Sequence, residues 1–163
     1  MHEADQVMDM TAHLRRTATT VLLAGFGIFG VMQLVPYGRD HTNSRVSSEP
    51  AWDRPATRAL AVRACFDCHS NETHWPWYSN VAPVSWLVQR DVDVGRRRVN
   101  FSEWDRPYKE AGESAESVLE GEMPPIIYLP LHASANLSAE EKRSLADGLA
   151  ATIGRATEGA DGN

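Results

Sequence analysis

Apolar and polar positions divide the chain into one long apolar run and a series of short amphipathic segments. Residues 17–35 (TATTVLLAGFGIFGVMQLV) contain no charged side chain over 19 positions. A helix of that length extends roughly 28 Å, about the hydrocarbon thickness of a bilayer. The pattern therefore predicts a single transmembrane anchor that ends at Pro36 and Gly38.

Two alternatives exist for this apolar run, a buried core helix and a cleaved signal peptide. All faces of the run are apolar or small, and a domain of this size rarely buries such a helix. The preceding stretch carries Glu3, Asp5 and Asp9 instead of a positively charged n-region, and no small-x-small cleavage site follows. These features favour an uncleaved anchor.

The remaining segments predict a tail, a linker and one compact domain. Residues 36–50 are rich in polar and turn-forming residues, which is typical of an extended linker. The predicted organisation is a cytoplasmic tail over 1–16, the anchor over 17–35, the linker over 36–50, a compact domain over 51–153 and a disordered polar tail over 154–163.

Apolar residues inside the compact domain recur at helical spacings, and no segment shows a sustained two-residue alternation. Asp53 is placed to cap the first helix, and Ser138 with Glu141 forms a capping box for the last one. The sequence therefore predicts an all-α domain. Its predicted helices run from Pro55 to the cysteines, from Pro83 to Arg97, from Ser114 to Gly121 and from Ser138 to Ile153.

The overall charge changes the picture little. The 163 residues carry a formal net charge of -6, and 23% of them are charged. A nucleic-acid-binding surface needs a basic stripe, so this balance argues against a nucleic-acid partner. An acidic exterior can steer a basic redox partner, but it identifies none.

The decisive motif is C-x-x-C-H at residues 65–69 (CFDCH), which contains the only two cysteines of the chain. This pattern is typical of c-type haem attachment. The Cys65 and Cys68 thiols can each form a thioether with one haem vinyl group, and His69 then lies beneath the iron as proximal ligand. The expected cofactor is haem c.

Other uses of the two cysteines fit the sequence less well. A thioredoxin-like motif would lie in a βαβ context, and no strand–helix alternation is visible. A structural zinc site needs four ligands with paired spacing, which the remaining histidines do not supply. A disulfide between Cys65 and Cys68 stays open as an alternative.

The second axial ligand is predicted to be Met123, which lies in the sequence Gly-Glu-Met-Pro-Pro. The two prolines restrict the backbone of the segment that carries Met123, which we call the strap. The alternatives are His132 as ligand, or Met123 as an ordinary gap-filling methionine. A thioether ligand favours ferrous iron, and two protein ligands favour electron transfer over catalysis. Aromatic residues 75–78 (WPWY) are expected to wall the pocket.

Several runs of the sequence together resemble a known family. These are QLVPYGR, CFDCHSNETHWPWYSNVAPVSWLV, NFSEW, GEMPP and LSAEEK, within residues 33–150. They resemble the small membrane-anchored haem-binding domain family of bacteria, which is related to c-type cytochromes. The resemblance implies an α-helical, cytochrome c-like domain. The site residues it implies are Cys65 and Cys68 for haem attachment, His69 as axial ligand, and Met123, Tyr128 and His132 in the later segment.

The predicted function is one-electron transfer at the outer face of a bacterial cytoplasmic membrane, with the N-terminus inside. The location follows from haem attachment, because the familiar c-type attachment systems work outside that membrane. The redox partner is not specified by the sequence. The alternatives are a haem peroxidase-like enzyme with a labile distal ligand, and a haem subunit or sensor of a larger membrane complex.

Overall fold

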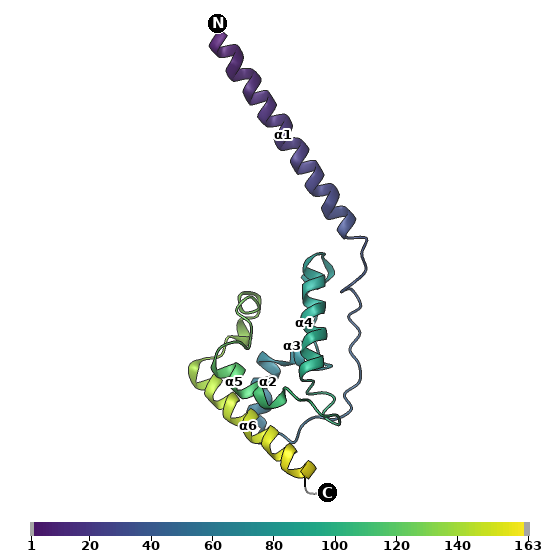
Figure 1. Ribbon diagram of the computed structural model, residues 1–163, viewed down its shortest axis with the longest axis vertical. Coiled ribbons are helices and arrows are strands. Elements are labelled where there is room, and N and C mark those ends of the chain that lie inside the picture. The colour runs from purple at the N-terminus through teal and green to yellow at the C-terminus, as the bar shows by residue number, and fades with distance from the viewer. Residues whose placement is uncertain (1, 162–163) are drawn as a thin grey trace.

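The computed structural model describes the backbone of residues 2–161 and the side chains of Gln6 and residues 9–154 (Figure 1). Within these residues the protein is all-α, as predicted, and has no strands. The α-helices are α1 (His2–Met32), α2 (Pro55–Ala64), α3 (Phe66–His69), α4 (Val84–Arg98), α5 (Ser114–Leu119) and α6 (Ala139–Asp161). The short 3-10 helices are η1 (Trp77–Asn80), η2 (Ala111–Glu113), η3 (Leu129–Leu131) and η4 (Ala133–Ala135).

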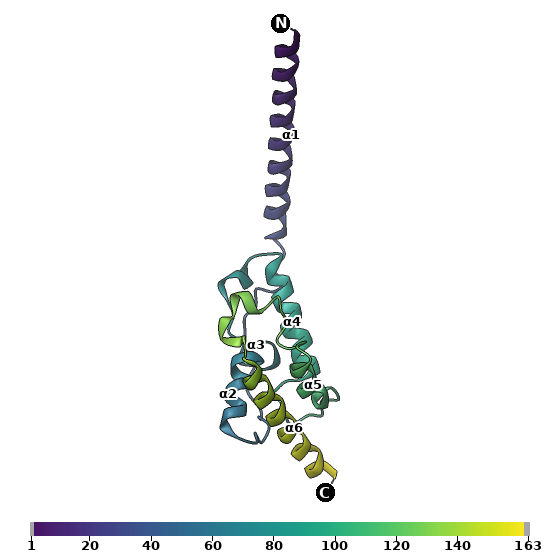
Figure 2. The ribbon, with the colours of Figure 1, turned by 90° about the vertical axis from the view of Figure 1, so that its left-hand side faces the viewer.

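Helix α1 is a straight rod that projects away from the other helices in both perpendicular views (Figures 1 and 2). It joins the predicted tail to the predicted anchor, and its large apolar side chains are exposed. The predicted transmembrane helix over 17–35 is not supported. The helix ends at Met32, before the last three positions of the apolar run. No helix among the described residues is long and apolar enough to cross a membrane.

The segment over 36–50 is extended, and it lies along the domain. The backbone N–H of Ser47 donates to the carbonyl of Ser102 at 2.8 Å, and that of Trp104 donates to the carbonyl of Ser48 at 3.1 Å. Ser48 also forms an isolated parallel bridge with Glu103. These contacts attach the segment to the chain that follows α4.

The hydrophobic core lies between α2, α5 and α6. Leu145 and Leu149 of α6 are fully buried, and they belong to one cluster with Phe66 of α3, Val118 of α5 and Phe101, which follows α4. The capping box at the start of α6 is confirmed, because the Glu141 N–H donates to Ser138 Oγ at 3.1 Å. The polar tail predicted over 154–163 continues α6 as helix to residue 161, and residues 162–163 lie outside the described part.

Helix α2 begins at Pro55, which was expected within its first turn, but Asp53 does not cap it. Arg54 occupies the cap position, and the helix start has no side-chain cap. Asp53 instead pairs with Arg54, and its backbone N–H donates to Thr152 Oγ1 of α6 at 3.0 Å. The residue that precedes α2 therefore attaches it to α6.

Helix α4 has the predicted bounds within one residue, but it buries a different face. Val92 is buried as expected, whereas Val84 and Leu87 are 40% and 53% exposed. The positions buried with Val92 are the small residues Ser85 and Gly95. Small residues lie on the buried face because α4 approaches the neighbouring backbone closely.

Candidate haem-binding cleft

The C-x-x-C-H motif lies on a single helical turn at the end of α2. The backbone N–H of Cys65 still donates to Ala61 of α2, at 2.8 Å. The N–H groups of Cys68 and His69 then both donate to the Cys65 carbonyl, at 3.1 and 2.9 Å. The turn places Cys68 and His69 three and four residues after Cys65, on the same side of α3.

Helix α4 contacts this turn through Gly95. A Cβ atom added at Gly95 would lie 2.9 Å from the carbonyl carbon and 3.1 Å from the Cβ of Cys68. Both separations are shorter than ordinary van der Waals contact, so only glycine fits at this position. Gly95 carries no signal in the local sequence, because its constraint comes from a neighbour in space.

Both cysteines are free thiols, so the structure has no disulfide between them. Burial raises the pKa of Cys65 to about 12, with a further contribution from nearby Cys68. Burial also raises the pKa of Cys68 to about 12, assisted by the carboxylates of Asp91 and Asp67. The thiols therefore remain protonated at neutral pH. Protonated thiols are poor metal ligands and poor partners for disulfide exchange.

His69 is held in the orientation that an iron ligand requires. Its Nδ1 lies 3.0 Å from the carbonyl oxygen of Val99, just after α4. Because a carbonyl only accepts, Nδ1 carries the proton and Nε2 keeps a free lone pair. Burial lowers the pKa of His69, and this effect exceeds the opposing effect of the Val99 hydrogen bond. The imidazole is thus neutral and ready to coordinate a metal.

A cleft lies next to His69 and contains about 620 Å³ of space free of protein atoms, including its open mouth. Cys65, His69 and Met123 line it together, although Met123 is 54 residues after His69 in sequence. The strap that carries Met123 is attached to α5, because the Met123 N–H donates to the Ser117 carbonyl at 3.0 Å. The structure therefore brings one of the two predicted attachment residues, Cys65, together with the predicted proximal and distal residues. Cys68 does not line this cleft and lies against Gly95.

The residues of this cleft fit a haem. Its walls are apolar where Ala64, Val99, Phe101, Val118 and Leu149 line it, as a porphyrin face requires. Its mouth is polar and includes the ion pair between Arg98 and Glu110, whose Nε–Oε2 distance is 3.2 Å. A neutral imidazole, a thioether and an apolar wall form the kind of donor set that holds haem iron.

His132 does not line the cleft, and both of its ring nitrogens are already engaged. Nδ1 lies 2.9 Å from the Tyr128 carbonyl, and Nε2 lies 3.1 Å from the Tyr78 hydroxyl. The ring also stacks on Tyr128 with a centroid distance of 3.6 Å. His41 lies elsewhere, stacked on Trp75. Among the histidines with described side chains, the cleft lining contains His69 alone.

A short hydrogen bond joins the strap to the haem motif itself. The Tyr128 hydroxyl donates to Oδ2 of Asp67, which lies between the two cysteines, at 2.5 Å. Burial raises the pKa of Tyr128, and the hydrogen bond with the Asp67 carboxylate raises it further. Tyr128 therefore stays a hydrogen-bond donor. The aromatic residues of 75–78 are placed differently from the prediction, because none of them lines the cleft.

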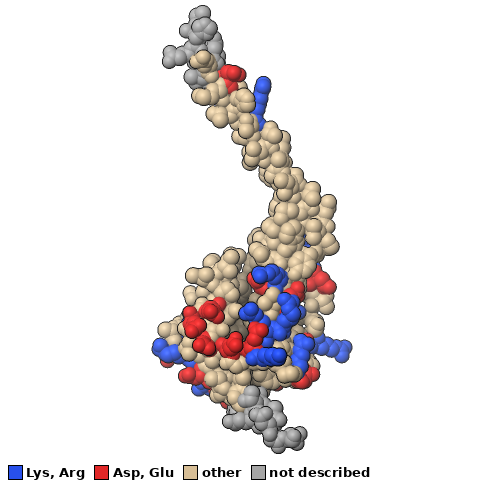
Figure 3. All heavy atoms as spheres, in the orientation of Figure 1, with Lys and Arg blue, Asp and Glu red and all other residues tan. Residues whose placement is uncertain are grey.

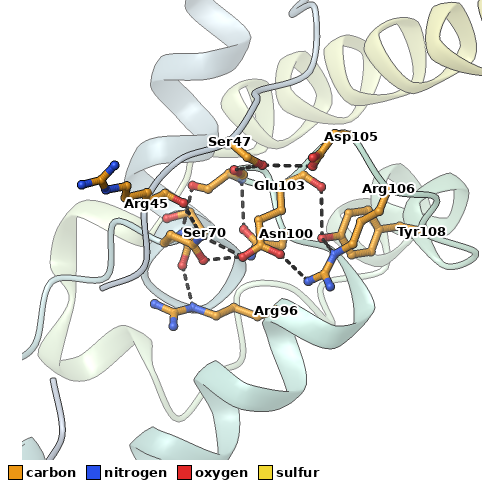
Figure 4. Close-up of polar contacts among 11 residues, drawn as sticks. Arg45, Ser47, Ser70, Arg96, Asn100, Glu103, Asp105, Arg106 and Tyr108 are labelled. Atoms are coloured by element: carbon orange, nitrogen blue, oxygen red, sulfur yellow. Dashed lines mark hydrogen bonds and ion pairs between the residues drawn. The ribbon is translucent and has the colours of Figure 1, made fainter. Parts of the chain in front are cut away.

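A buried polar network supports the far side of the motif (Figure 4). Arg96 of α4 donates through Nε to the Ser70 carbonyl at 2.8 Å. Asn71 donates through Nδ2 to the Arg45 carbonyl at 3.0 Å and to Glu103 at 2.9 Å. The network connects the haem motif with the extended segment and the chain after α4, so the turn cannot shift alone.

Comparison with known proteins agrees with this geometry. Residues 27–151 match the model of the haem-binding domain family. Because the match covers most of the 163 residues, the chain belongs to that family and binds haem. No curated protein and no solved structure matches the chain.

Proposed function

We propose that this haem-binding protein is a monohaem c-type cytochrome that transfers one electron at a time. The observation that carries the proposal is the cleft in which Cys65, His69 and Met123 meet. The hydrogen bond from His69 to Val99 leaves only Nε2 for the iron. When bound, the haem supplies reversible one-electron chemistry through its ferric and ferrous states.

Each residue then has a defined role. Cys65 and Cys68 would hold the haem covalently, each thiol adding across one vinyl group with its sulfur on one vinyl carbon and its hydrogen on the other. His69 provides the proximal nitrogen. Met123 provides a soft sulfur ligand that favours the ferrous state. The apolar lining raises the potential further, because it penalises the additional positive charge of the ferric state.

An electron carrier is favoured over a peroxidase-like enzyme. If His69 and Met123 both held the iron, no coordination position would be left open for peroxide. Arg98, the cationic side chain at the mouth of the cleft, is paired with Glu110. An enzyme would instead need a labile distal ligand, so peroxide turnover by the wild-type protein would support that alternative.

We also propose that the haem domain works at the outer face of the bacterial cytoplasmic membrane. Covalent haem attachment by the familiar systems takes place on that side. The exposed apolar side chains of α1, such as Leu22, Phe26 and Phe29, support attachment to a membrane. Fractionation of cells that express the holoprotein, with a salt wash of the membrane fraction, tests both the side and the attachment.

The attachment chemistry is tested by expressing the chain together with a haem-attachment system. The haem should stay with the polypeptide in acid acetone and on a denaturing gel. Cys65→Ala and Cys68→Ala variants should each lose one thioether, which shifts the pyridine haemochrome spectrum. Haem that is fully extracted from the wild-type protein would rule out covalent binding.

The distal ligand is tested with Met123→Ala and His132→Ala as a matched pair. Met123→Ala should retain the haem, lower the reduction potential and let the reduced protein bind carbon monoxide. His132→Ala should leave carbon monoxide binding at the wild-type level, because His132 does not line the cleft. Ready binding of carbon monoxide by the reduced wild-type protein would contradict six-coordination.

A further inference from the structure

An exposed apolar surface follows the proposed distal ligand along the chain. Ile126, Ile127 and Leu131 are 85%, 79% and 69% exposed. They lie three to eight residues after Met123, in the loop that Figure 1 draws in light green above α5. Single exposed apolar residues are common, but three large ones within six positions form a patch of the kind that marks an interaction site. We call these three residues the apolar lobe.

The apolar lobe belongs to an anchored loop. The Met123 N–H donates to Ser117 of α5 before the lobe, and the Tyr128 hydroxyl donates to Asp67 of α3 within it. The Tyr128 N–H also donates to the Pro125 carbonyl at 2.9 Å, which closes a tight turn around the two isoleucines. These bonds hold the isoleucines outward at a fixed place beside the cleft.

The border of the lobe is strongly acidic. From residue 110 to residue 132 the chain carries five glutamates and neither lysine nor arginine. Glu113, Glu116 and Glu120 are spaced by three and four residues, so they share one side of η2 and α5. Like charges at this spacing weaken a helix. The arrangement therefore does not stabilise the fold.

These carboxylates are exposed and mostly free of internal cations. Glu110 pairs with Arg98, but no ion pair in the described part of the chain involves Glu113, Glu116, Glu120 or Glu122. Figure 3 shows the acidic side chains gathered below an uncharged lobe, on one side of a hollow, with basic side chains on the other side. The lobe and its acidic border thus form one continuous surface at the mouth of the cleft.

We propose that this surface, the apolar lobe with its border of glutamates, is the docking site for a basic redox protein that presents lysines or arginines around an apolar centre. The inference rests on the proposed electron-transfer function and names the chemistry of its partner. Charge complementarity would steer the partner, and contact with the isoleucines would hold it close to the haem edge next to Met123.

Other occupants of this surface are less compatible with its charge. A second copy of the chain, docked through the same patch, would bring two sets of glutamates together. An anionic lipid surface would be repelled in the same way. Two arginines of α4 are already engaged within the protein, because Arg98 pairs with Glu110 and Arg96 donates to the Ser70 carbonyl.

The test uses the full-length reduced holoprotein and two small oxidants of opposite charge. Tris(phenanthroline)cobalt(III) is an apolar trication, and ferricyanide is a trianion. Stopped-flow rate constants are measured over a range of ionic strength for Glu116→Gln/Glu120→Gln and for the control Asp9→Asn/Asp147→Asn. Both variants change the net charge equally, but the control positions lie on α1 and α6, outside the patch.

At low salt the patch variant should react about fivefold more slowly with the cobalt complex, whereas the control should match the wild type. The difference should vanish at high salt, where charges are screened. Ile126→Ser/Ile127→Ser should slow the cobalt reaction at every ionic strength and leave the ferricyanide rate unchanged. Equal cobalt rates for the patch variant and the control would overturn the proposal.

Two further measurements separate the possible failures. Voltammetry of the same holoprotein tests the electron-transfer function itself, since absence of a reversible one-electron wave would refute that function and leave the surface without a role. Sedimentation tests the second copy as occupant. A wild-type dimer that Ile126→Ser/Ile127→Ser dissociates would overturn the proposal of a basic partner.

Discussion

Two glycines let helices approach closely in this molecule, and the two contacts differ in what they meet. Gly148 of α6 faces Thr57 of α2, and an added Cβ would lie 2.6 Å from Thr57 Cγ2. Gly95 of α4 faces the backbone and Cβ of Cys68, with an added Cβ 2.9 Å from the carbonyl carbon. The first contact joins two core helices, and the second supports the haem motif.

The comparison shows that the site tolerates change less than the core does. A methyl group added at Gly148 would clash with the side chain of Thr57, and a mutation that shortens Thr57 would relieve this clash. The carbonyl of Cys68 belongs to the turn that holds His69 and cannot be removed. The turn is also attached to Arg96 and to Val99. A larger side chain at Gly95 would therefore displace His69, the proposed iron ligand.

The largest expected effect is that of Gly95→Ala. The added methyl group pushes α4 away from Cys68, which should cost about 3 kcal/mol in the free energy of unfolding. Because Val99 moves with α4, haem attachment should also fall. Urea titration and in-gel haem staining measure the two effects. Wild-type haem loading in this variant would show that the contact does not support the site.

Gly148→Ala should destabilise the protein by about 2 kcal/mol and leave haem attachment intact. Combined with Thr57→Ala, it should be less destabilising than the sum of the two single variants, because the methyl group then occupies the vacated space. A double-mutant cycle in urea provides the coupling energy. Strict additivity would mean that α2 and α6 do not meet as described.

Tyr128→Phe tests the link between the strap and the motif. It removes the hydrogen bond to Oδ2 of Asp67, while the His74 N–H still donates to Oδ1, and should cost about 1.5 kcal/mol. The strap should loosen, so the reduced protein should bind carbon monoxide faster. Tyr108→Phe, outside the cleft, is the control. An unchanged carbon monoxide rate would show that Met123 is held without Tyr128.

The smallest expected effect concerns the pH dependence of the free energy of unfolding, through the ion pair between Glu49 and Arg58. Arg58 donates to both carboxylate oxygens of Glu49 and thereby lowers the pKa of Glu49. A lowered folded-state pKa stabilises the protein above the ordinary glutamate pKa, and the contribution is lost as the pH falls through the folded-state value. Glu49→Gln should cost about 1 kcal/mol at neutral pH and nothing in strong acid. Parallel stability curves at all pH values would contradict this.

The sequence predicted the helices and the attachment motif because those signals are local. Helix α4 follows from apolar periodicity, the start of α6 from Ser138 and Glu141, and the haem motif from five adjacent residues. Met123 was also predicted as the distal ligand, and the structure brings it into the cleft with His69. Its role as a ligand stays a prediction that the carbon monoxide experiment addresses.

Other features depend on residues that meet only after folding. Gly95 carries no local signal, because its need for a missing Cβ is set by Cys68, 27 positions earlier. The hydrogen bond between Tyr128 and Asp67 spans 61 residues. The buried face of α4 was predicted wrongly for the same reason. Apolar periodicity favoured valine and leucine on that face, whereas close approach to the haem motif selects small residues there.

The hydrogen bonds that attach residues 33–50 to the domain also limit how far the haem can travel. Gln33, directly after α1, bonds to the backbone of Ala82, and further contacts follow at Asn43 and Ser47, ten and fourteen residues later. A freely jointed tether lets its cargo sweep a volume that grows with tether length. The segment therefore leaves little slack between α1 and the domain. An electron carrier attached to a membrane through α1, as proposed above, would have to receive mobile redox partners because it could not travel to them.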